Sequence, residues 1–488
     1  MSGLDGIVAG VADGIVPGLQ YSLATKRGAK YVKQRNSSTF YPNTSNTYSI
    51  TSGQRTIRVL FSDAGSSMLD LSTVRMACVI RNNGPNPLVF TGRHLACMFQ
   101  RITTRVKGVQ VDDIQFYNRL CGMLMSFRPA NANYSDGVAQ LGTGYHDQII
   151  EGGEIHANGI RLLGPDVELI PGNSARRVIF DLPGVSILNN HYLLPLGRYP
   201  LEITLEMVSD PRKVLAAGYL NTDESVNTTV STSFQIEEVE FKGDTLLLDS
   251  AVISNIEEAL VGQKPLSLHL RPWNVTMYNV AGTSTWSQIF NRAYSRLLSI
   301  FVNFTPKTVA PEFEELYTES NLFSSWHGDK SQEGAAGTSA NGWRPGSAPR
   351  YSFTRDEFRY QVQLGSQLYP NTAIRSHAES YYHLQKCVGE LTTGVGVSTG
   401  PTYRSTNFHL ATDFEKVAST PAGQADFSGV NTKMSGEQMR LFFEKVSFVE
   451  DMTGGAPDQW SFAPDQMYIC ANYDQIVQLR LEGVVLAD

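Results

Sequence analysis

The sequence predicts an all-β protein built from two tandem antiparallel sandwiches with one short helix in each. Three observations lead to this prediction. Over many short segments apolar residues alternate with polar ones, which is typical of strands that bury one face. Turn-forming residues separate these segments, and no βαβ alternation is present. The 488 residues exceed what one hydrophobic core ordinarily supports, so we expect at least two domains.

The composition narrows the classes of function. Charged residues make up 18% of the chain, which is low for a globular protein. The 40 basic and 47 acidic residues give a net charge of −7, which excludes a general nucleic-acid-binding protein. The five cysteines are widely spaced among apolar neighbours, which predicts buried reduced thiols rather than disulfides or a zinc site. They are Cys78, Cys97, Cys121, Cys387 and Cys470.

Residues 1–38 predict a flexible basic N-terminal arm. Apolar residues recur near helical spacing, but glycines at short intervals disfavour a stable isolated helix. Such an arm is a candidate contact for the phosphates of a genome or for an acidic membrane surface, and a solvated tail is the alternative. Its five clustered basic residues are Lys26, Arg27, Lys30, Lys33 and Arg35.

Residues 39–262 are expected to form the first sandwich. One strong helix is predicted at Gln115–Met125 and a short one at Ile256–Leu260. Gly262 and Pro265 follow the short helix, and we place the domain boundary between residues 262 and 263. The expected strands are Arg55–Phe61, Val74–Ile80, two within Leu95–Val111 that break near Thr103–Thr104, Arg177–Phe180, Tyr192–Leu194, Leu201–Met207 and Phe234–Leu248.

Residues 263–488 repeat this pattern as the second sandwich. Within Ser299–Thr305 the apolar Ile300, Val302 and Phe304 alternate with more polar residues, which predicts a central strand. The long Gly-, Ser- and Ala-rich stretch Ser324–Pro349 has no strand pattern and is interpreted as a functional loop. The other expected strands are Ser267–Tyr278, Arg359–Leu364, Asn407–Ala411, Met439–Val449, Gln466–Ala471 and Ile476–Leu481, with a helix at Ala378–Val388.

A short internal repeat supports two related sandwiches. The segments Pro200–Asp210 and Pro464–Asp474 share a register, because each begins with proline, alternates as a strand and ends with aspartate. We interpret them as corresponding strands of the two halves.

The sequence provides little support for a catalytic site. Residues Gly396–Gly400 match the Gly-x-Ser-x-Gly pattern, but Pro401 and a Gly/Thr-rich context replace the helix that such a motif requires. The nine histidines form no His-Glu-x-x-His motif, and acidic neighbours in sequence do not supply opposed general acids and bases. We therefore expect no enzyme, no cofactor and no metal site.

Several segments taken together carry a resemblance to a known family. They are Phe61–Asp63 with Met68–Ser72, Tyr192–Leu196 leading into Leu201–Met207, Ser295–Leu297 with Ile300–Phe304, Leu368–Pro370, Ala378–Tyr382, Phe427–Lys433 and Tyr473–Asp474. Over residues 45–488 the sequence resembles the double jelly-roll major capsid proteins of icosahedral DNA viruses. It is similar to the smaller members among virophage, Polinton-like and related groups.

The resemblance implies two tandem eight-stranded jelly rolls and a homotrimer whose six sandwiches form a pseudo-hexagonal tile of the virion capsid, assembled inside the host cell. The implied partners are neighbouring capsomers, minor capsid and penton proteins and, through the arm, the genome or an internal membrane. The arm alternatively orders only against neighbouring capsomers through Ile7, Val11, Ile15 and Leu19. Ser324–Pro349 is then a candidate outer or trimer-locking loop.

A tandem β-sandwich that binds or cleaves carbohydrate is the alternative function. Aromatic residues can stack on the faces of sugar rings, although packing in a core or an interface is their more frequent role. The tryptophans concerned are Trp286, Trp326, Trp343 and Trp460. A cleaving enzyme also needs an opposed pair of carboxylates near them, and the sequence offers no clear candidate.

Overall fold

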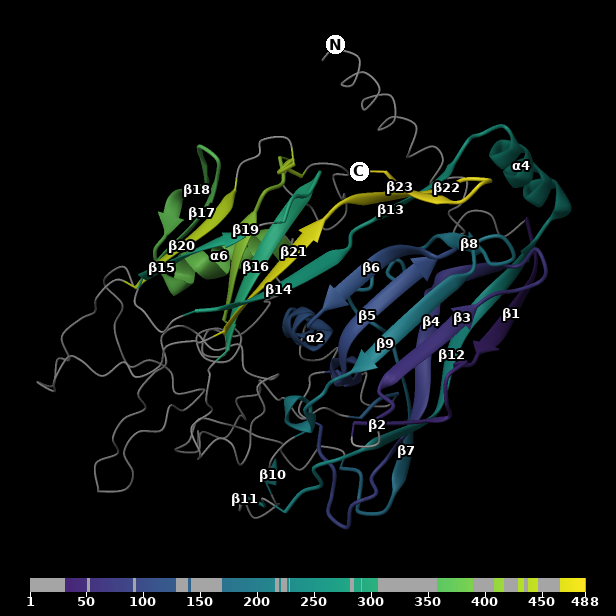
Figure 1. Cartoon of the computed structure of the whole chain (residues 1–488), viewed down its shortest axis with the longest axis horizontal. Coiled ribbons are helices and arrows are strands. Elements are labelled where there is room, and N and C mark those ends of the chain that lie inside the picture. Colours follow the sequence, from purple (N-terminus) through teal and green to yellow (C-terminus); the bar gives the residue numbers. More distant parts are fainter. Residues whose placement is uncertain are drawn as a thin grey trace, which may run out of the picture.

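The computed structural model describes residues 31–50, 53–90, 94–128, 139–141, 169–215, 219–220, 226–227, 229–280, 285–290, 292–305, 358–388, 408–416, 429–433, 438–445 and 466–487. In these ranges the protein is mostly β, and the strands form two groups along the chain (Figure 1). Neighbouring strands in both groups pair antiparallel. The helices are α2 (Tyr117–Ser126), α4 (Ser250–Val261) and α6 (His377–Val388).

The first group is an eight-stranded jelly roll. One sheet, called sheet 1A here, has the strand order β1-β12-β4-β7, and the other, sheet 1B, has the order β3-β9-β5-β6. In chain order these are strands 1-8-3-6 facing strands 2-7-4-5. The bounds are β1 (Val32–Phe40), β3 (Thr56–Phe61), β4 (Met68–Arg81), β5 (Phe99–Val106), β6 (Val109–Gln115), β7 (Ala175–Phe180), β9 (Leu201–Met207) and β12 (Gln235–Leu248).

The second group repeats the same topology. Sheet 2A has the order β14-β21-β16-β19 and sheet 2B has the order β15-β20-β17-β18. The helix lies between the fifth and sixth strands in both jelly rolls, as α2 in the first and α6 in the second. The bounds are β14 (Trp273–Asn279), β15 (Thr285–Phe290), β16 (Leu297–Thr305), β17 (Phe358–Leu364), β18 (Gln367–Ile374), β19 (His409–Asp413), β20 (Met439–Lys445) and β21 (Gln466–Tyr473). The predicted tandem jelly-roll fold is confirmed.

Alternation in sequence builds these sheets. In β3, Ile57, Val59 and Phe61 are buried while the residues between them are exposed. The predicted central strand is β16, which lies between β21 and β19, and its Ile300 and Val302 are fully buried. Buried apolar residues of the two jelly rolls belong to one continuous core cluster, so the halves pack on each other rather than hang from a linker.

Two features connect the jelly rolls: helix α4 and a small sheet that includes the C-terminal strands. Helix α4 begins after Asp249, whose carboxylate accepts a hydrogen bond from Ala251 N at 3.0 Å. A small three-stranded sheet of β13 (Leu266–Leu270), β22 (Gln475–Leu479) and β23 (Val484–Ala487) then joins the second half to the first. The Tyr199 hydroxyl donates to the backbone oxygen of Arg480 at 2.9 Å, which fastens the β22–β23 hairpin to the first jelly roll. The boundary expected at residues 262–263 falls between α4 and β13.

Short elements complete the described part of the first half. They are β2 (Thr47–Ser49), β8 (Leu193–Pro195), β10 (Tyr219–Leu220), β11 (Val226–Asn227) and the 3-10 turns η3 (Leu95–Met98) and η4 (Pro211–Lys213).

The start of the first jelly roll corrects the predicted arm. Residues Val32–Phe40 form β1, which pairs with β12 at the edge of sheet 1A and is the first of the eight strands. The prediction of a flexible arm is therefore wrong for residues 32–38. The strand was missed because it is polar and largely exposed along its length, so it shows no apolar alternation.

The predicted repeat does not join corresponding strands. Pro200–Asp210 contains β9, the seventh strand of the first jelly roll, whereas Pro464–Asp474 contains β21, the eighth strand of the second. The true counterparts by position are β9 with β20 and β12 with β21. A proline, an alternating strand and a terminal aspartate are general features of strands between turns, so the shared register was coincidental.

The predicted break near Thr103–Thr104 is also misplaced. Both threonines lie within β5, where only the register against β6 shifts. The chain reverses at Lys107 and Gly108, whose φ angles of 48° and 83° are those a tight two-residue hairpin requires. β-Branched threonines suit a strand better than a turn, which explains the difference.

Candidate assembly surface

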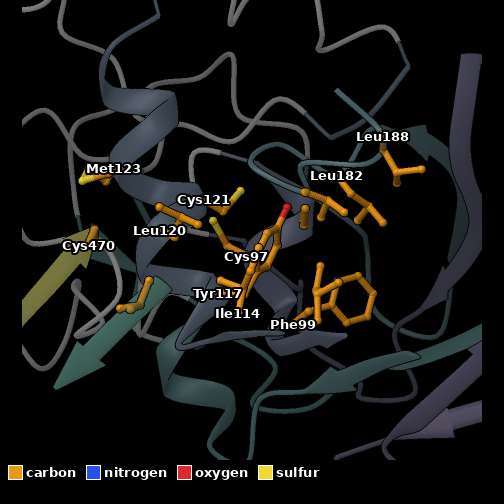
Figure 2. Packing of buried hydrophobic residues seen from close by; sticks show 14 of the residues in the cluster. Cys97, Phe99, Ile114, Tyr117, Leu120, Cys121, Met123, Leu182, Leu188 and Cys470 are labelled. Atoms are coloured by element: carbon orange, nitrogen blue, oxygen red, sulfur yellow. The ribbon is translucent and has the colours of Figure 1, made fainter. Parts of the chain in front are cut away.

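Helix α2 lies between the two jelly rolls and packs against both. All of its residues other than Leu124 are buried. On one side Tyr117 and Cys121 enter the core of the first jelly roll, where the Tyr117 hydroxyl donates to the Pro183 carbonyl at 2.8 Å. On the other side Met123 lies near Cys470 of sheet 2A (Figure 2). Helix α2 is thus enclosed by both jelly rolls although Asn118 and Arg119 give it a polar side in sequence.

The contacts of α2 with sheet 2A are mainly aromatic. The Arg119 guanidinium lies over the ring of Tyr468, 5.1 Å from its centroid. Phe127, directly after the helix, packs on Phe301 with ring centroids 5.6 Å apart. These contacts bury the outer face of sheet 2A, the face that points away from the interior of its own jelly roll.

A buried polar network completes this internal interface. His409 of β19 places Nε2 2.9 Å from the Ser126 hydroxyl and bonds through Nδ1 to the side-chain oxygen of Asn303. The Ser126 hydroxyl donates to the Met123 carbonyl at 2.6 Å. His409 and Asn303 are fully or almost fully buried. Buried groups that satisfy one another in this way fix a single arrangement of the two jelly rolls.

Sheet 1A holds the corresponding position in the first jelly roll, but its outer face is charged. Along β12 buried residues alternate with Glu240, Lys242 and Asp244, which point outward. Among the described residues helix α4 covers one end of this face, where its apolar residues meet Leu246 and Leu248. The remainder forms a surface, called the charged face here, that includes Arg35, Arg81, Arg177 and the acidic residues of β12.

Ion pairs connect the cations and anions of the charged face. Arg177 pairs with Glu238 at 3.2 Å and also with Glu240, which lies 3.4 Å from Lys242. Arg81 pairs with Glu237 at 2.8 Å. The side chains of Arg177 and Lys242 are 51% and 44% exposed, whereas that of Glu240 is 13% exposed. The side chain of Glu238 is 69% exposed, so this part of the face presents charges of both signs.

Helix α6 is the counterpart of α2 and has one open side. His377, Ser380 and Leu384 are buried against the second jelly roll. The helix begins with a capping box, in which Glu379 N bonds to the Ser376 hydroxyl at 3.2 Å and Arg375 N bonds to the Glu379 carboxylate at 2.7 Å. Glu379 and Tyr382 are exposed, with Tyr382 at 52%.

The two helices can be aligned at their first residues, Tyr117 and His377. Leu120 and Leu124 of α2 then correspond to Ser380 and Leu384 of α6. On the outer side Arg119 corresponds to Glu379 and Gly122 to Tyr382. The sheet-facing Met123 and Ser126 correspond to His383 and Lys386, which are both half-buried, and Lys386 pairs with Asp413 of β19 at 3.0 Å. Only the edge of α6 that carries Glu379 and Tyr382 is exposed.

The predicted basic cluster is divided by the structure. Lys26, Arg27 and Lys30 lie outside the described residues. Lys33 pairs with Asp249 at 3.6 Å, and Arg35 pairs with Asp244 through Nε at 2.7 Å. These two cations belong to the ion pairs of β1 rather than to an arm.

Other sequence candidates are resolved in part. Trp286 stacks on Phe443 with ring centroids 5.4 Å apart, so it serves the core of the second jelly roll. Trp326, Trp343, Trp460, the Ser324–Pro349 stretch and the Gly396–Gly400 motif lie outside the described residues. The five cysteines are free thiols, and burial raises the pKa of Cys78 and of Cys470 to about 12, which makes these two unreactive.

In the part of the chain that the structure describes, no group of three or more His, Cys, Asp or Glu residues could hold a metal ion. Over the same residues, none of the helices has the length and apolar character needed to cross a membrane.

A half-buried acidic group lies where sheet 2A ends. Glu415 follows β19, and its backbone N bonds to the Asp413 carboxylate at 2.9 Å. Asp413 pairs with Lys386 at 3.0 Å, and the nearby Asp474 is held by His269 and Arg271. Burial raises the pKa of Glu415 to about 7, and the neighbouring Asp413 carboxylate adds to the rise. Glu415 therefore changes charge near neutral pH.

Sequence reasoning did not identify this assembly surface. Helix α2 was predicted but its burial on both sides was not, since Asn118 and Arg119 give Gln115–Met125 a polar side. The signal for the charged face was the alternation of charged with apolar residues in Glu238–Asp244, which predicted a strand but not its neighbours. Arg177 and Arg35 join that surface only through strand pairing across the sheet.

The fold is similar to several solved viral structures. VP54 of PBCV-1, fitted into a reconstruction of the virophage Sputnik, has a TM-score of 0.57 at 12% identity and covers 94% of this chain and 97% of its own. The Sputnik virophage structure gives 0.54 at 11% identity, with 94% and 89% covered. The faustovirus major capsid protein gives 0.50 at 10% identity, with 91% and 90% covered. At these identities the likeness establishes a shared double jelly-roll fold. No family model and no curated protein matches the sequence.

Proposed function

We propose that this chain is the major capsid protein of an icosahedral virus and that it assembles as homotrimers that tile the shell. The observation that carries the proposal is the pair of jelly rolls with the same strand order, packed side by side through α2 in one fixed arrangement. Three chains joined end to end would place six jelly rolls in a ring. The double jelly-roll fold shared with capsid proteins over nearly the whole chain supports this role.

The role is structural rather than enzymatic. The interface between the jelly rolls is a fixed, fully packed contact of a helix with a sheet, which suits a building block that must keep its shape. Neighbouring capsomers, minor capsid proteins and penton proteins are the partners of such a subunit, and the virion capsid is its location.

Within this proposal the N-terminal residues face the particle interior. Lys26, Arg27 and Lys30 supply positive charge for genome phosphates or an acidic membrane surface, since Lys33 and Arg35 are already paired within the chain. Replacing these three residues with serine is expected to leave trimers intact and to reduce the yield of filled particles. A normal yield of filled particles would remove the arm from the proposal.

Native mass spectrometry with negative-stain microscopy tests the main proposal. The purified protein is expected to give trimers and, at high concentration, pseudo-hexagonal tiles or shells. A protein that stays monomeric from low to high concentration and salt would contradict the capsid role.

A further inference from the structure

Two threonines form the floor of a polar hollow on the outer face of sheet 1B. Thr103 of β5 lies directly opposite Thr204 of β9, and these strands are the inner pair of the four-stranded sheet. Longer charged side chains occupy the neighbouring positions along both strands and across to β3 and β6, so the short threonines leave a depression between them. The hollow has a volume of about 170 Å³ and is lined by Thr56, Arg101, Thr103, Arg105, Thr204 and Glu206.

The charges around this hollow balance to zero. Three arginines and three carboxylates neighbour the threonine pair, and they are Arg58, Arg101, Arg105, Asp113, Glu202 and Glu206. Arg101 donates to the Asp113 carboxylate through Nε at 2.8 Å and Nη2 at 2.9 Å. Arg58 and Arg105 both pair with Glu202, at 2.6 Å and 3.5 Å. Each arginine therefore already has a carboxylate partner, and the hollow carries no net charge that would attract an ion.

Several polar groups of the hollow make no hydrogen bond to any described residue. They are the Glu206 carboxylate and the hydroxyls of Thr56, Thr103 and Thr204. Thr103 is only 9% exposed, and the exposed part of its side chain faces the hollow. The two bonds of Arg101 to Asp113 also leave its Nη1 unused. A carboxylate accepts, a guanidinium donates and a hydroxyl does both, so the hollow offers donors and acceptors together.

We propose that this hollow binds one ring of a neutral carbohydrate. Each hydroxyl of a sugar ring both donates and accepts, which matches the mixture of groups that the hollow leaves without partners. An anion would meet the Glu206 carboxylate, and a cation would meet Arg101 and Arg105, so both are disfavoured. Ordinary small-molecule sites have volumes of about 300–1,000 Å³, so a hollow of about 170 Å³ suits a single ring.

The affinity of one such site is expected to be weak. The residues that line the hollow include no aromatic side chain on which a sugar ring could stack, so binding depends on hydrogen bonds alone. Much of the strength of these bonds is offset by the loss of bonds to water, which places the expected dissociation constant in the millimolar range. The whole site lies within one chain, so sugar binding is independent of the proposed capsid function.

Saturation-transfer difference NMR with three neutral probes tests the site directly. The methyl glycosides of glucose, galactose and mannose are added separately to the unaltered protein, and at least one is expected to bind. Thr103→Val and Thr204→Val keep the β-branched shape and remove one hydroxyl each. Each variant is expected to weaken binding of that probe about fivefold, because one hydrogen bond is lost. Thermal melts are expected to be unchanged, since these hydroxyls have no partner within the described chain.

A change of charge at Glu206 tests why the ligand is neutral. Glu206→Gln keeps the size of the side chain and leaves the surrounding charges with a net value of +1. Sugar binding is expected to fall about tenfold, because hydrogen bonds to a charged acceptor are roughly twice as strong as neutral ones. The same variant is expected to bind inorganic phosphate, measured by phosphorus NMR, more tightly than the unaltered protein does.

A matched control and two contrary outcomes complete the test. Thr39→Val makes the same substitution at an exposed position of β1, on sheet 1A, and is expected to bind sugar like the unaltered protein. No transfer from any of the three probes, or equal binding by the Thr39, Thr103 and Thr204 variants, would overturn the site. Tighter binding of phosphate or methylguanidinium than of every sugar by the unaltered protein would also overturn it, by showing a site for ions. None of these results bears on trimer formation, so the capsid proposal is judged separately.

Discussion

In sheet 2A the strands β16, β19 and β21 bury residues on both faces, whereas in sheet 1A strand β12 buries mainly alternate residues. The two sheets have the same strand order and the same place in their jelly rolls. The difference is that α2 covers one of them within the chain. Topology therefore fixes where an interface can form, and the outward side chains decide whether it is permanent or reversible.

The comparison also separates two kinds of energy. Burying apolar and aromatic groups on sheet 2A contributes to the free energy of folding, since both sides of the interface belong to one chain. Exposed ion pairs on sheet 1A contribute little to folding, because solvent screens them. Substitutions on the outer face of sheet 2A should therefore change the free energy of unfolding of the isolated chain much more than substitutions on the charged face of sheet 1A.

Removing an aromatic ring from the internal interface should have the largest effect. Phe301 is 3% exposed and lies 5.6 Å from the rings of both Phe127 and Trp273. Phe301→Ala is expected to lower the free energy of unfolding by about 3–4 kcal/mol, because it leaves a cavity between the jelly rolls. Urea unfolding followed by tryptophan fluorescence measures the change.

A matched control lies on the outer face of sheet 2B. Phe442 is only half-buried there, with Arg440 over its ring at 5.0 Å. Phe442→Ala is expected to lower the free energy of unfolding by about 1 kcal/mol, because the ring of Phe442 buries less apolar surface than that of Phe301. Equal losses for the two variants would show that α2 contributes no special packing to sheet 2A.

Much of the fold could be predicted from the sequence for physical reasons that are local. Strands such as Thr56–Phe61 and Leu201–Met207 bury alternate residues, so their period is visible without any partner. Helix α2 and the central strand β16 were predicted nearly at their observed bounds. Local periodicity was therefore enough to predict most of the secondary structure and the number of jelly rolls.

What could not be predicted depends on pairing between distant segments. β1 is a polar edge strand that exists because β12, about 200 residues later, offers it hydrogen bonds. The charged face joins Arg35, Arg177 and Lys242 from three different strands, and no spacing in sequence connects them. The same limit explains the misassigned repeat, since strand order decides correspondence and similar local patterns do not.

Crowding α2 at one glycine tests how closely the helix packs on the first jelly roll. Gly184 has a φ of +80°, and a Cβ there would lie 2.8 Å from Leu124 Cδ1 and 3.3 Å from Leu120 Cδ2. Gly184→Ala is expected to lower the free energy of unfolding by about 2 kcal/mol, through backbone strain together with displacement of the Leu124 and Leu120 side chains. Gly108→Ala is the control, because its φ is +83° but nothing lies within 4 Å of the added Cβ. Thermal melts should show a smaller loss at Gly108, and the same loss at both sites would contradict the close approach.

A smaller and pH-dependent effect is expected where charges gather at the end of sheet 2A. The pKa of Glu415 is raised in the folded chain from 4.5 to about 7, first by burial and then by the Asp413 carboxylate. Below pH 4.5 the group is protonated in both the folded and the unfolded states, so it imposes no penalty. As pH rises through 7 the folded state must ionise it, and stability is lost.

Glu415→Gln removes this penalty and should stabilise the chain above pH 7. The group is half-buried, so we discount the full shift for solvent screening and expect about 1 kcal/mol at pH 8 and almost none at pH 4.5. Urea unfolding at the two pH values measures the difference. A stabilisation of the same size at both would show that the amide acts through packing and that ionisation of Glu415 has no part.

The smallest effect should come from the charged face, although it carries the densest ion pairing. Arg177 contacts both Glu238 and Glu240, yet its side chain is 51% exposed and Lys242 remains 3.4 Å from Glu240 when the arginine is removed. Arg177→Ala should therefore change the free energy of unfolding of the isolated chain by less than about 0.5 kcal/mol, and less still at 1 M NaCl. Urea unfolding at dilutions where only monomers are present makes the measurement. A loss as large as that of Phe301→Ala would mean that the charged face stabilises the fold itself, and the distinction between the permanent face of sheet 2A and the reversible face of sheet 1A would then fail.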